Sequence, residues 1–453
     1  MNTRQHASNN TKLRLQLLPR ALVALGLGIV MNTASAQLST PPPISFKPAV
    51  LTPLPGLAIG GSGFSESTMV NGNFNSKDTD PVTGQPDKHL DLLISNPYLG
   101  FAPILLLGNG DGTFRPGPTI AASITGWLGQ SLLVGDFNKD GNLDFAVAGG
   151  TFAFVNIYLG DGHGHFTHAD TKIDFQPGQS DGFVQDVNGD GFDDLVIKDA
   201  IGIRVYLNDG HGNFPATADA KVTVAPATGI VISSIKPAKF HTGNNIPDLA
   251  ACDAITQKVY KYLGHDDGTG HGDGTYTLVA SADAGIACGS LVVGDFNADG
   301  IDDVAAFPEF NIVNFNNKQF LRNAAVLISS ADGGFRPAVY YHAGLFPANA
   351  AIGDLNGDGK PDLVSSDVVG NSIVTLAGYG DISGIFVDGG LSNTWSVIGP
   401  NEIPLLNGYQ ESTPVGDYNE DGKPDIATTV LKLVGIPPGR SYLSVLINNS
   451  PSP

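Results

Sequence analysis

The residues best suited to chemistry in this 453-residue chain are aspartates and asparagines that recur in one nine-residue pattern. Five stretches carry Asp, Asn, Asp and Asp at positions 1, 3, 5 and 9, with Gly at position 6; they are residues 136–144, 186–194, 295–303, 354–362 and 417–425. Alternate positions direct side-chain oxygens toward one centre, and the Gly permits a tight turn. Hard oxygen ligands suit Ca²⁺, so each stretch is a candidate calcium loop.

The candidate ligands in each loop are the side chains at positions 1, 3, 5 and 9 and the backbone carbonyl at position 7. In chain order they are Asp136, Asn138, Asp140, Asn142 and Asp144; Asp186, Asn188, Asp190, Phe192 and Asp194; Asp295, Asn297, Asp299, Ile301 and Asp303; Asp354, Asn356, Asp358, Lys360 and Asp362; and Asp417, Asn419, Asp421, Lys423 and Asp425. They imply about five Ca²⁺ ions as the cofactor. Because the loop recurs at ordered intervals, we expect the ions to be structural; the alternative is that they regulate ligand binding.

An EF-hand opens with the same pattern, but it requires a bidentate Glu at position 12 and a helix on either side. Position 12 of the five loops is Val147, Ile197, Ala306, Ser365 or Thr428. The flanks are short β-type runs, such as residues 131–135 before the first loop and 145–148 after it. The loops are therefore expected to join β-strands, and helical calcium modules are excluded.

A second element follows each loop after about one strand length. It consists of an apolar run, a Gly- and Asp-rich turn and an aromatic residue, as in residues 104–114 and 155–166. Gly supplies positive φ in such turns and Asp or Asn tolerates it, so each element predicts a β-hairpin. The repeating unit is then strand, acidic loop, strand, strand, Gly-rich turn, strand.

Two degenerate loops complete the count of units. One starts at Asn73 and reaches its last acidic position, Asp91, after a long insertion, whereas residues 239–248 keep the shape and lose the carboxylates. The first positions of the seven loops are separated by 50 to 63 residues. Seven four-stranded units of this period predict an all-β fold, a seven-bladed β-propeller with antiparallel blades.

The two ends of the chain predict how the ring closes. The seventh unit stops at residues 442–448, before its outer strand, and residues 44–50 resemble the outer strands of other units. We therefore expect the N-terminal segment to supply the last strand of the last blade, which removes open sheet edges. The propeller is assigned to residues 58–448, after a Pro-rich segment at 37–57, and residues 449–453 form a short tail.

The motif Gly-Asp-Phe-Asn-x-Asp-Gly-x-x-Asp, followed by the Leu-Gly-x-Gly-x-Gly-x-Phe hairpin, resembles the FG-GAP/VCBS-type repeat family. That family includes the seven-bladed head of integrin α subunits, in which such loops carry Ca²⁺. The resemblance covers nearly all of the chain after residue 36. The loops at 73 and 239 depart from the motif, so no full metal site is assigned to them. The family implies fold and metal but leaves function open, since it scaffolds adhesins, lectins and enzyme domains alike.

The first 36 residues have the features of a signal peptide. Four basic residues come first: Arg4, Lys12, Arg14 and Arg20. An apolar run at 21–31 and the small residues Ala34 and Ala36 then predict cleavage before Gln37. We expect a protein that is secreted, periplasmic or on the cell surface, with no transmembrane segment, because the apolar run is too short for a span.

The chain is acidic. Removing residues 1–36 deletes four basic and no acidic side chains, so the formal charge moves from −20 to −24. Nucleic acids and anionic membrane surfaces are therefore disfavoured as partners, because both demand basic patches. We expect a monomer whose partner is an extracellular glycan or protein.

Only two cysteines are present, Cys252 after the fourth loop and Cys288 before the fifth. Adjacent blades would carry them on inner strands. In an oxidising compartment they predict a disulfide, and the alternative is two small buried thiols.

Motifs for catalysis are missing: the chain has no Gly-x-Ser-x-Gly, no His-Glu-x-x-His and no phosphate-binding Gly-Lys-Ser/Thr. The pairs Asp193-Asp194 and Asp302-Asp303 resemble acid/base pairs, but alternation points the first of each away from the metal loop. Six histidines lie in or beside separate Gly-Asp turns, which favours solvated loop residues over a transition-metal site. They are His163, His165, His168, His211, His265 and His271.

Two longer features are candidates for specificity, the insertion 76–89 and the segment 389–409 with Trp395. If Trp395 is exposed, it can stack on a sugar or anchor a protein; the alternative is that it packs against the protein. Trp127 is expected to pack near a blade. We expect a secreted, calcium-stabilised propeller of the adhesion or recognition type, more consistent with binding than with catalysis. A polysaccharide-degrading lyase or hydrolase and a structural part of a cell-surface assembly are the alternatives.

Overall fold

A computed structural model of the chain describes the compact unit Thr40–Pro453 in sixteen stretches. They are residues 40–54, 68–95, 103–121, 130–149, 154–174, 180–199, 202–215, 231–243, 245–308, 323–330, 332–345, 347–367, 370–387, 393–397, 413–432 and 440–451. The predicted signal peptide, Trp127 and most of the segment 389–409 lie outside them.

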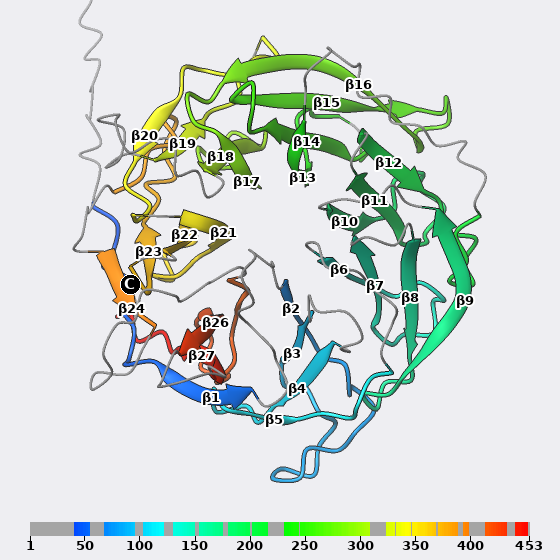
Figure 1. Cartoon of the computed structure of the whole chain (residues 1–453). Coiled ribbons are helices and arrows are strands. Elements are labelled where there is room, and N and C mark those ends of the chain that lie inside the picture. Colours follow the sequence, from blue (N-terminus) through cyan, green and yellow to red (C-terminus); the bar gives the residue numbers. More distant parts are fainter. Residues whose placement is uncertain are drawn as a thin grey trace, which may run out of the picture. The chain divides into compact units, whose positions relative to one another are not determined.

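The described strands form seven antiparallel sheets, which are the blades of the propeller (Figure 1). Blades one to three are β2 (Met69–Gly72), β3 (Asp91–Ile94), β4 (Ile104–Gly108) and β5 (Phe114–Pro116); β6 (Gln130–Gly135), β7 (Asp144–Gly149), β8 (Phe154–Gly160) and β9 (Phe166–Asp174); and β10 (Asp181–Gln185), β11 (Asp194–Asp199) and β12 (Gly202–Tyr206). The third blade has three described strands and every other blade has four.

Blades four to seven follow the same order in the chain. They are β13 (Ile232–Ala238), β14 (Asp248–Asp253), β15 (Lys258–Asp266) and β16 (Gly272–Asp283); β17 (Cys288–Gly294), β18 (Asp303–Pro308), β19 (Ala324–Leu327) and β20 (Val339–Tyr341); β21 (Pro347–Gly353), β22 (Asp362–Asp367), β23 (Ser372–Leu376) and β24 (Thr394–Ser396); and β25 (Val415–Gly416), β26 (Asp425–Lys432), β27 (Arg440–Leu446) and β1 (Val50–Leu54). The prediction of an all-β, seven-bladed propeller is confirmed.

The hydrophobic core consists of seven clusters, one between each pair of neighbouring blades. The second strand of a blade contributes to both of its interfaces, which is why β11, β14 and β22 are buried along their whole length. In β11 and β14 residues 195–197 and 249–251 form short apolar runs instead of strict alternation, and β22 also buries Ser365 and Ser366. Each blade can therefore bury its faces only against its two neighbours.

The N-terminal segment closes the ring, as predicted. Strand β1 pairs with β27 from Val50 opposite Val445 to Leu54 opposite Ser441, and Figure 1 shows the two side by side. The regular strand begins where the predicted one ends. Upstream of it, Lys47 N–H donates to the Ile447 carbonyl at 2.8 Å, and the pairing is then interrupted next to Pro48, which has no N–H to donate.

One buried aspartate holds the loop and the hairpin of every blade together. In the second blade, Asp144 Oδ2 accepts the Phe137 N–H at 2.8 Å and Oδ1 accepts the Gly160 N–H at 2.7 Å, so a single carboxylate joins the loop to the end of the third strand. We call this arrangement the aspartate clamp. The seven clamp residues are Asp91, Asp144, Asp194, Asp248, Asp303, Asp362 and Asp425, and all are 0% exposed.

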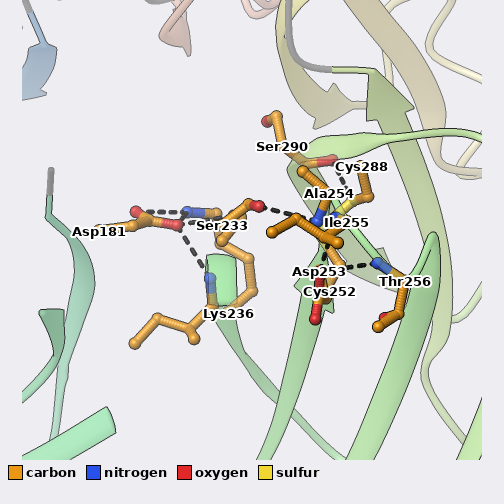
Figure 2. Close-up of a disulfide and its surroundings, with 12 residues drawn as sticks. Asp181, Ser233, Lys236, Cys252, Asp253, Ala254, Ile255, Thr256, Cys288 and Ser290 are labelled. Atoms are coloured by element: carbon orange, nitrogen blue, oxygen red, sulfur yellow. Dashed lines mark hydrogen bonds and ion pairs between the residues drawn. A yellow bond between two sulfur atoms is a disulfide. The ribbon is translucent and has the colours of Figure 1, made fainter. Parts of the chain in front are cut away.

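The other end of blades three to five carries two further connections between blades (Figure 2). Cys252 in β14 and Cys288 in β17 form a disulfide with their Cα atoms 6.0 Å apart, so this prediction is confirmed. Asp181 in β10 accepts hydrogen bonds from the Ile235 N–H at 2.9 Å and from Lys236 Nζ at 3.1 Å, both in β13. Covalent and charged contacts thus reinforce two consecutive blade interfaces.

Reducing the disulfide is expected to destabilise the propeller. The bond closes a segment with a sequence separation of 36 residues, and a loop of that length corresponds to about 3–4 kcal/mol of lost unfolded-state entropy. Guanidinium unfolding of residues 37–453 with and without reductant measures the difference. An unchanged midpoint, after mass spectrometry has confirmed reduction, would contradict this expectation.

The aspartate clamp can be tested apart from any metal in the fourth blade, whose loop lacks the acidic ligands. Asp248→Ala leaves the N–H groups of Phe240 and Gly264 without their acceptor and also removes the 2.7 Å contact of Asp248 with His241 Nδ1, at a cost of about 3–5 kcal/mol in the free energy of unfolding. Asp267→Ala in the same blade removes an exposed turn carboxylate that accepts from Thr269 and is the control, with an unfolding midpoint expected close to that of the wild type. Equal unfolding midpoints for the two variants would refute the clamp.

Candidate metal loops

The side chains at positions 1, 3 and 5 of each acidic loop fold over one turn. In the loop 136–144, the Asp140 N–H donates to Asp136 Oδ1 at 3.0 Å and to Asn138 Oδ1 at 3.1 Å. The Gly141 N–H donates to the second Asp136 oxygen at 2.9 Å. Three predicted ligands therefore converge on one turn of backbone, as the alternation of the motif requires.

The other four loops repeat this geometry. The N–H at position 5 donates to the Asn at position 3 at 3.0–3.1 Å in each of them, and the N–H at position 6 donates to the Asp at position 1 at 2.8–2.9 Å. Positions 4 and 6 both adopt positive φ, for example 56° at Lys139 and 85° at Gly141. Sequence reasoning identified only position 6: position 4 is Gly in two loops, Gly189 and Gly357, but Lys, Ala or Glu in the other three hides the left-handed backbone there.

The aspartate at position 9 is held differently from the other predicted ligands. Both of its oxygens accept backbone N–H groups in the clamp, and it lies close enough to the position 5 carboxylate to interact with it electrostatically. Burial raises the pKa of Asp144 to about 6 against the effect of the N–H donors, and Asp140 raises it further. The same causes raise the pKa of Asp425 to about 6 and those of Asp194, Asp303 and Asp362 to about 7.

Each loop also contacts the next blade. Asn208 at the third-blade hairpin donates to the Phe137 carbonyl at 2.8 Å, and the Asp136 N–H donates to Asp193 Oδ2 at 3.0 Å. Asp302 accepts the Lys239 N–H at 2.7 Å in the same way. The first members of the two carboxylate pairs therefore join blades and point away from their own loops, as predicted. The loops lie at the boundaries between blades.

The donor set of these loops fits Ca²⁺. Each provides two carboxylates, one Asn and a backbone carbonyl, all of them hard oxygen ligands. In the described residues, the buried Asn142 Oδ1 at position 7 has no hydrogen-bond donor, and the buried Asp358 Oδ2 at position 5 has only the ion pair with Lys360 Nζ at 3.8 Å. The described part of the chain holds no group of three Asp, Glu, His or Cys side chains placed to bind a metal. In each loop, the aspartate at position 9 instead accepts backbone N–H groups in the clamp, as Asp144 does. An ion would be held mainly by positions 1, 3, 5 and 7 and would neutralise the carboxylates.

The fourth blade carries a cation of its own beside its degenerate loop. Lys261 is 2% exposed, and its Nζ lies 3.1 Å from Ser329 Oγ and 4.5 and 4.6 Å from the ring centres of Phe240 and Phe335. Burial lowers its pKa, while the Asp303 and other carboxylates raise it. A lysine therefore occupies the interface between blades four and five, where the loop lacks acidic ligands.

The other candidate residues do not form a site together. His163 contacts Asp78 at 2.6 Å, whereas His168 contacts Asn156 at 3.1 Å. Trp395 packs edge-on against Phe46, with ring centres 5.4 Å apart, and donates from Nε1 to Thr375 Oγ1 at 3.1 Å. The packed alternative for Trp395 therefore holds. The described stretches contain no helix with the length and apolar character that a membrane crossing requires.

Comparison with known proteins agrees with this fold. The model of the FG-GAP-like repeat matches residues 86–147, which extend from the first-blade loop into β7. Among solved structures, a complex of BBS1N with ARL6DN has a TM-score of 0.50 at 11% identity, covering 90% of this chain and 98% of that chain. No curated protein matches the chain in sequence.

Two further solved structures are similar. An Agrocybe aegerita lectin that recognises non-reducing terminal N-acetylglucosamine has a TM-score of 0.48 at 19% identity, covering 74% of this chain and 87% of that chain. The V. cholerae biofilm matrix protein Bap1 has a TM-score of 0.43 at 11% identity, covering 89% and 91%. Such likenesses concern fold alone. Residues 86–147 match the FG-GAP-like repeat, and the seven antiparallel sheets make the described part of the chain a β-propeller.

Proposed function

We propose that this protein is an exported, calcium-stabilised β-propeller that recognises an extracellular glycan or protein. The observation that carries the proposal is the convergence of oxygen ligands in five equivalent loops on a closed ring. The predicted signal peptide, residues 1–36, supports export to a compartment in which Ca²⁺ is available and the disulfide is stable.

The role of the ions is structural in this proposal. Each loop brings two carboxylates onto one turn at a blade boundary, as Asp136 and Asp140 show. A divalent cation would offset their repulsion and tie the loop to the blade that packs against it. Binding to the folded state alone stabilises it by about 2.7 kcal/mol per site at a free concentration of 100 Kd. Five such sites would make folding strongly dependent on Ca²⁺.

Binding rather than catalysis is supported by how the reactive groups are used. Both cysteines are in the disulfide, and each described clamp aspartate accepts two backbone N–H groups. His163 contacts Asp78 and His168 contacts Asn156, and neither contact includes a Ser, Thr or Cys nucleophile. A rigid ring instead presents many loops on a fixed frame, which is a common arrangement for recognition.

Of the two specificity features, the insertion 76–89 lies within the described residues, and residues 393–397 are the described part of the segment 389–409. The insertion 76–89 lies in the connection between β2 and β3, at the end of the blades that carries all the acidic loops. Because Trp395 is packed against Phe46, other residues of the insertion 76–89 or of the segment 389–409 would contact a ligand.

Removal of Ca²⁺ is expected to lower the melting temperature of the mature protein by more than about 10 °C, since several sites each contribute a few kcal/mol. Thermal unfolding with Ca²⁺, with chelator and with Mg²⁺ measures this, and elemental analysis after dialysis counts the ions. Mg²⁺ should restore little stability, because it requires stricter octahedral geometry. A protein that binds no Ca²⁺ and melts at one temperature in all three buffers would overturn the metal assignment.

The recognition function is tested with the mature chain, residues 37–453, on a glycan array and in pull-downs from extracellular material. The expected result is saturable binding of one glycan class or one protein, with no change in the ligand. Chromatography of polysaccharides after incubation provides the opposite test. Release of oligosaccharides would replace the binding function with a degradative one.

A further inference from the structure

The degenerate loop of the first blade matches the others when it is aligned from its last residue. Asp91 forms the aspartate clamp, as position 9 does elsewhere. Asp87 precedes it by four residues, which is the separation between positions 5 and 9 in the other loops. Asn73 and Asn75 occupy positions 1 and 3. The segment 76–86 therefore replaces the single residue at position 4, and Asp87 is the position 5 carboxylate.

The hydrogen bonds confirm this alignment. Asn75 Nδ2 donates to Asp87 Oδ2 at 2.9 Å, and the same bond between positions 3 and 5 measures 3.2 Å in the loop 136–144. The His89 N–H donates to Asp87 Oδ1 at 2.9 Å, and the bond between positions 7 and 5 in the loop 136–144 is also 2.9 Å. The insertion thus leaves the shape of the ligand turn intact.

The insertion also brings a second carboxylate to the loop. It folds back on itself, with Thr79 paired to Pro86 and the Asp87 N–H donating to the Asp78 carbonyl at 2.9 Å. Asp78 Oδ2 then lies 3.5 Å from Asn75 Nδ2, and its Oδ1 contacts His163 Nδ1 at 2.6 Å. Asp78 therefore supplies a negative charge in place of the aspartate that position 1 has lost.

Two buried amide oxygens in this loop have no hydrogen-bond partner among the described residues, Asn73 Oδ1 and Asn75 Oδ1. Asn75 is 0% exposed, and its amide lies between the carboxylates of Asp78 and Asp87. In the other loops the position 5 N–H satisfies the position 3 oxygen, but the Asp87 N–H is used by Asp78. A buried oxygen without a donor costs about 1–3 kcal/mol, and a cation would satisfy both oxygens.

The basic side chains of Arg115 and His89 do not act as donors to these two amide oxygens. Arg115 Nη2 reaches only to 4.0 Å from Asp87 Oδ2, and its Nη1 donates to the Gly108 carbonyl at 2.8 Å. His89 points its Nδ1 at Glu420 of the seventh-blade loop. Neither side chain donates to Asn73 Oδ1 or Asn75 Oδ1.

We propose that the first blade binds a divalent cation of the Ca²⁺ type through the side-chain oxygens of Asn73, Asn75, Asp78 and Asp87. This sixth site rests on the proposed calcium binding of the other five loops and goes beyond it, because two neutral and two acidic ligands come from a loop that lacks the motif. Six blades then hold a divalent cation at their boundary, and the fourth holds Lys261.

Native mass spectrometry and elemental analysis of the mature chain at saturating Ca²⁺ test the proposal. The expected count is six ions for the wild type and five for Asp87→Asn. Asn73→Asp restores the acidic ligand at position 1 and should still bind six ions. The Ca²⁺ affinity of the weakest site should rise about tenfold, which corresponds to about 1.4 kcal/mol of binding free energy. Asp111→Asn removes a carboxylate of the first-blade hairpin that accepts the Thr113 N–H; it is the matched control and keeps six.

The outcomes are distinct. Five ions in the wild type, or six in Asp87→Asn, would overturn the first-blade site and leave the proposed function standing. No bound ions would overturn both. Circular dichroism checks that each variant folds. If Asp87→Asn does not fold, calorimetric titration of Asn73→Asp with Ca²⁺ provides the test. An unchanged Ca²⁺ affinity at the weakest site would then overturn the proposal.

Discussion

The whole ring depends on one interaction, a buried carboxylate that accepts two backbone N–H groups. In each blade it joins the loop after the first strand to the end of the third strand, as Asp144 joins Phe137 to Gly160. A buried charge is costly unless it is hydrogen-bonded, and here the cost is offset by donors that the loop could not satisfy otherwise. The clamp persists at Asp91 and Asp248, where the metal motif does not. Architecture therefore constrains position 9 more strictly than metal chemistry does.

The loops that the clamps fix are also where the blades meet. Asn208 reaches from the third blade to the second-blade loop, and the seventh-blade Asn448 donates to the Leu355 carbonyl of the sixth at 2.7 Å. Each boundary therefore needs something to offset acidic loops packed against a neighbour. Between blades four and five, where the fourth-blade loop lacks acidic ligands, the buried Lys261 interacts electrostatically with Asp303 and Asp248. Divalent cations are proposed for the remaining loops, so the same contacts that pack the blades together also neutralise the acidic loops.

Much of the fold and of the metal loops could be predicted from the sequence because the signals for turns and ligands are local. Position 6 is Gly since its backbone adopts a positive φ, 85° at Gly141, and hairpin turns are marked by Gly and Asp for the same reason. The closing strand was predicted but its register was not, because only the three-dimensional pairing shows that the ladder is interrupted at Pro48 and continues from Val50. Trp395 is another case: its exposure depends on Phe46, more than 300 residues away in the chain.

The sequence by itself determined the number of blades, the strand order within them and the residues of five oxygen-rich loops, because a repeated motif states its period and its ligands directly. Only the tertiary structure decided that the position 9 aspartates serve as clamps, that Asp193 and Asp302 join neighbouring blades, and that Asp87 completes the first-blade loop. The physical reason is that a carboxylate has the same chemistry wherever it stands, and its role depends on which N–H groups, charges or amide oxygens the fold brings within about 3 Å of it.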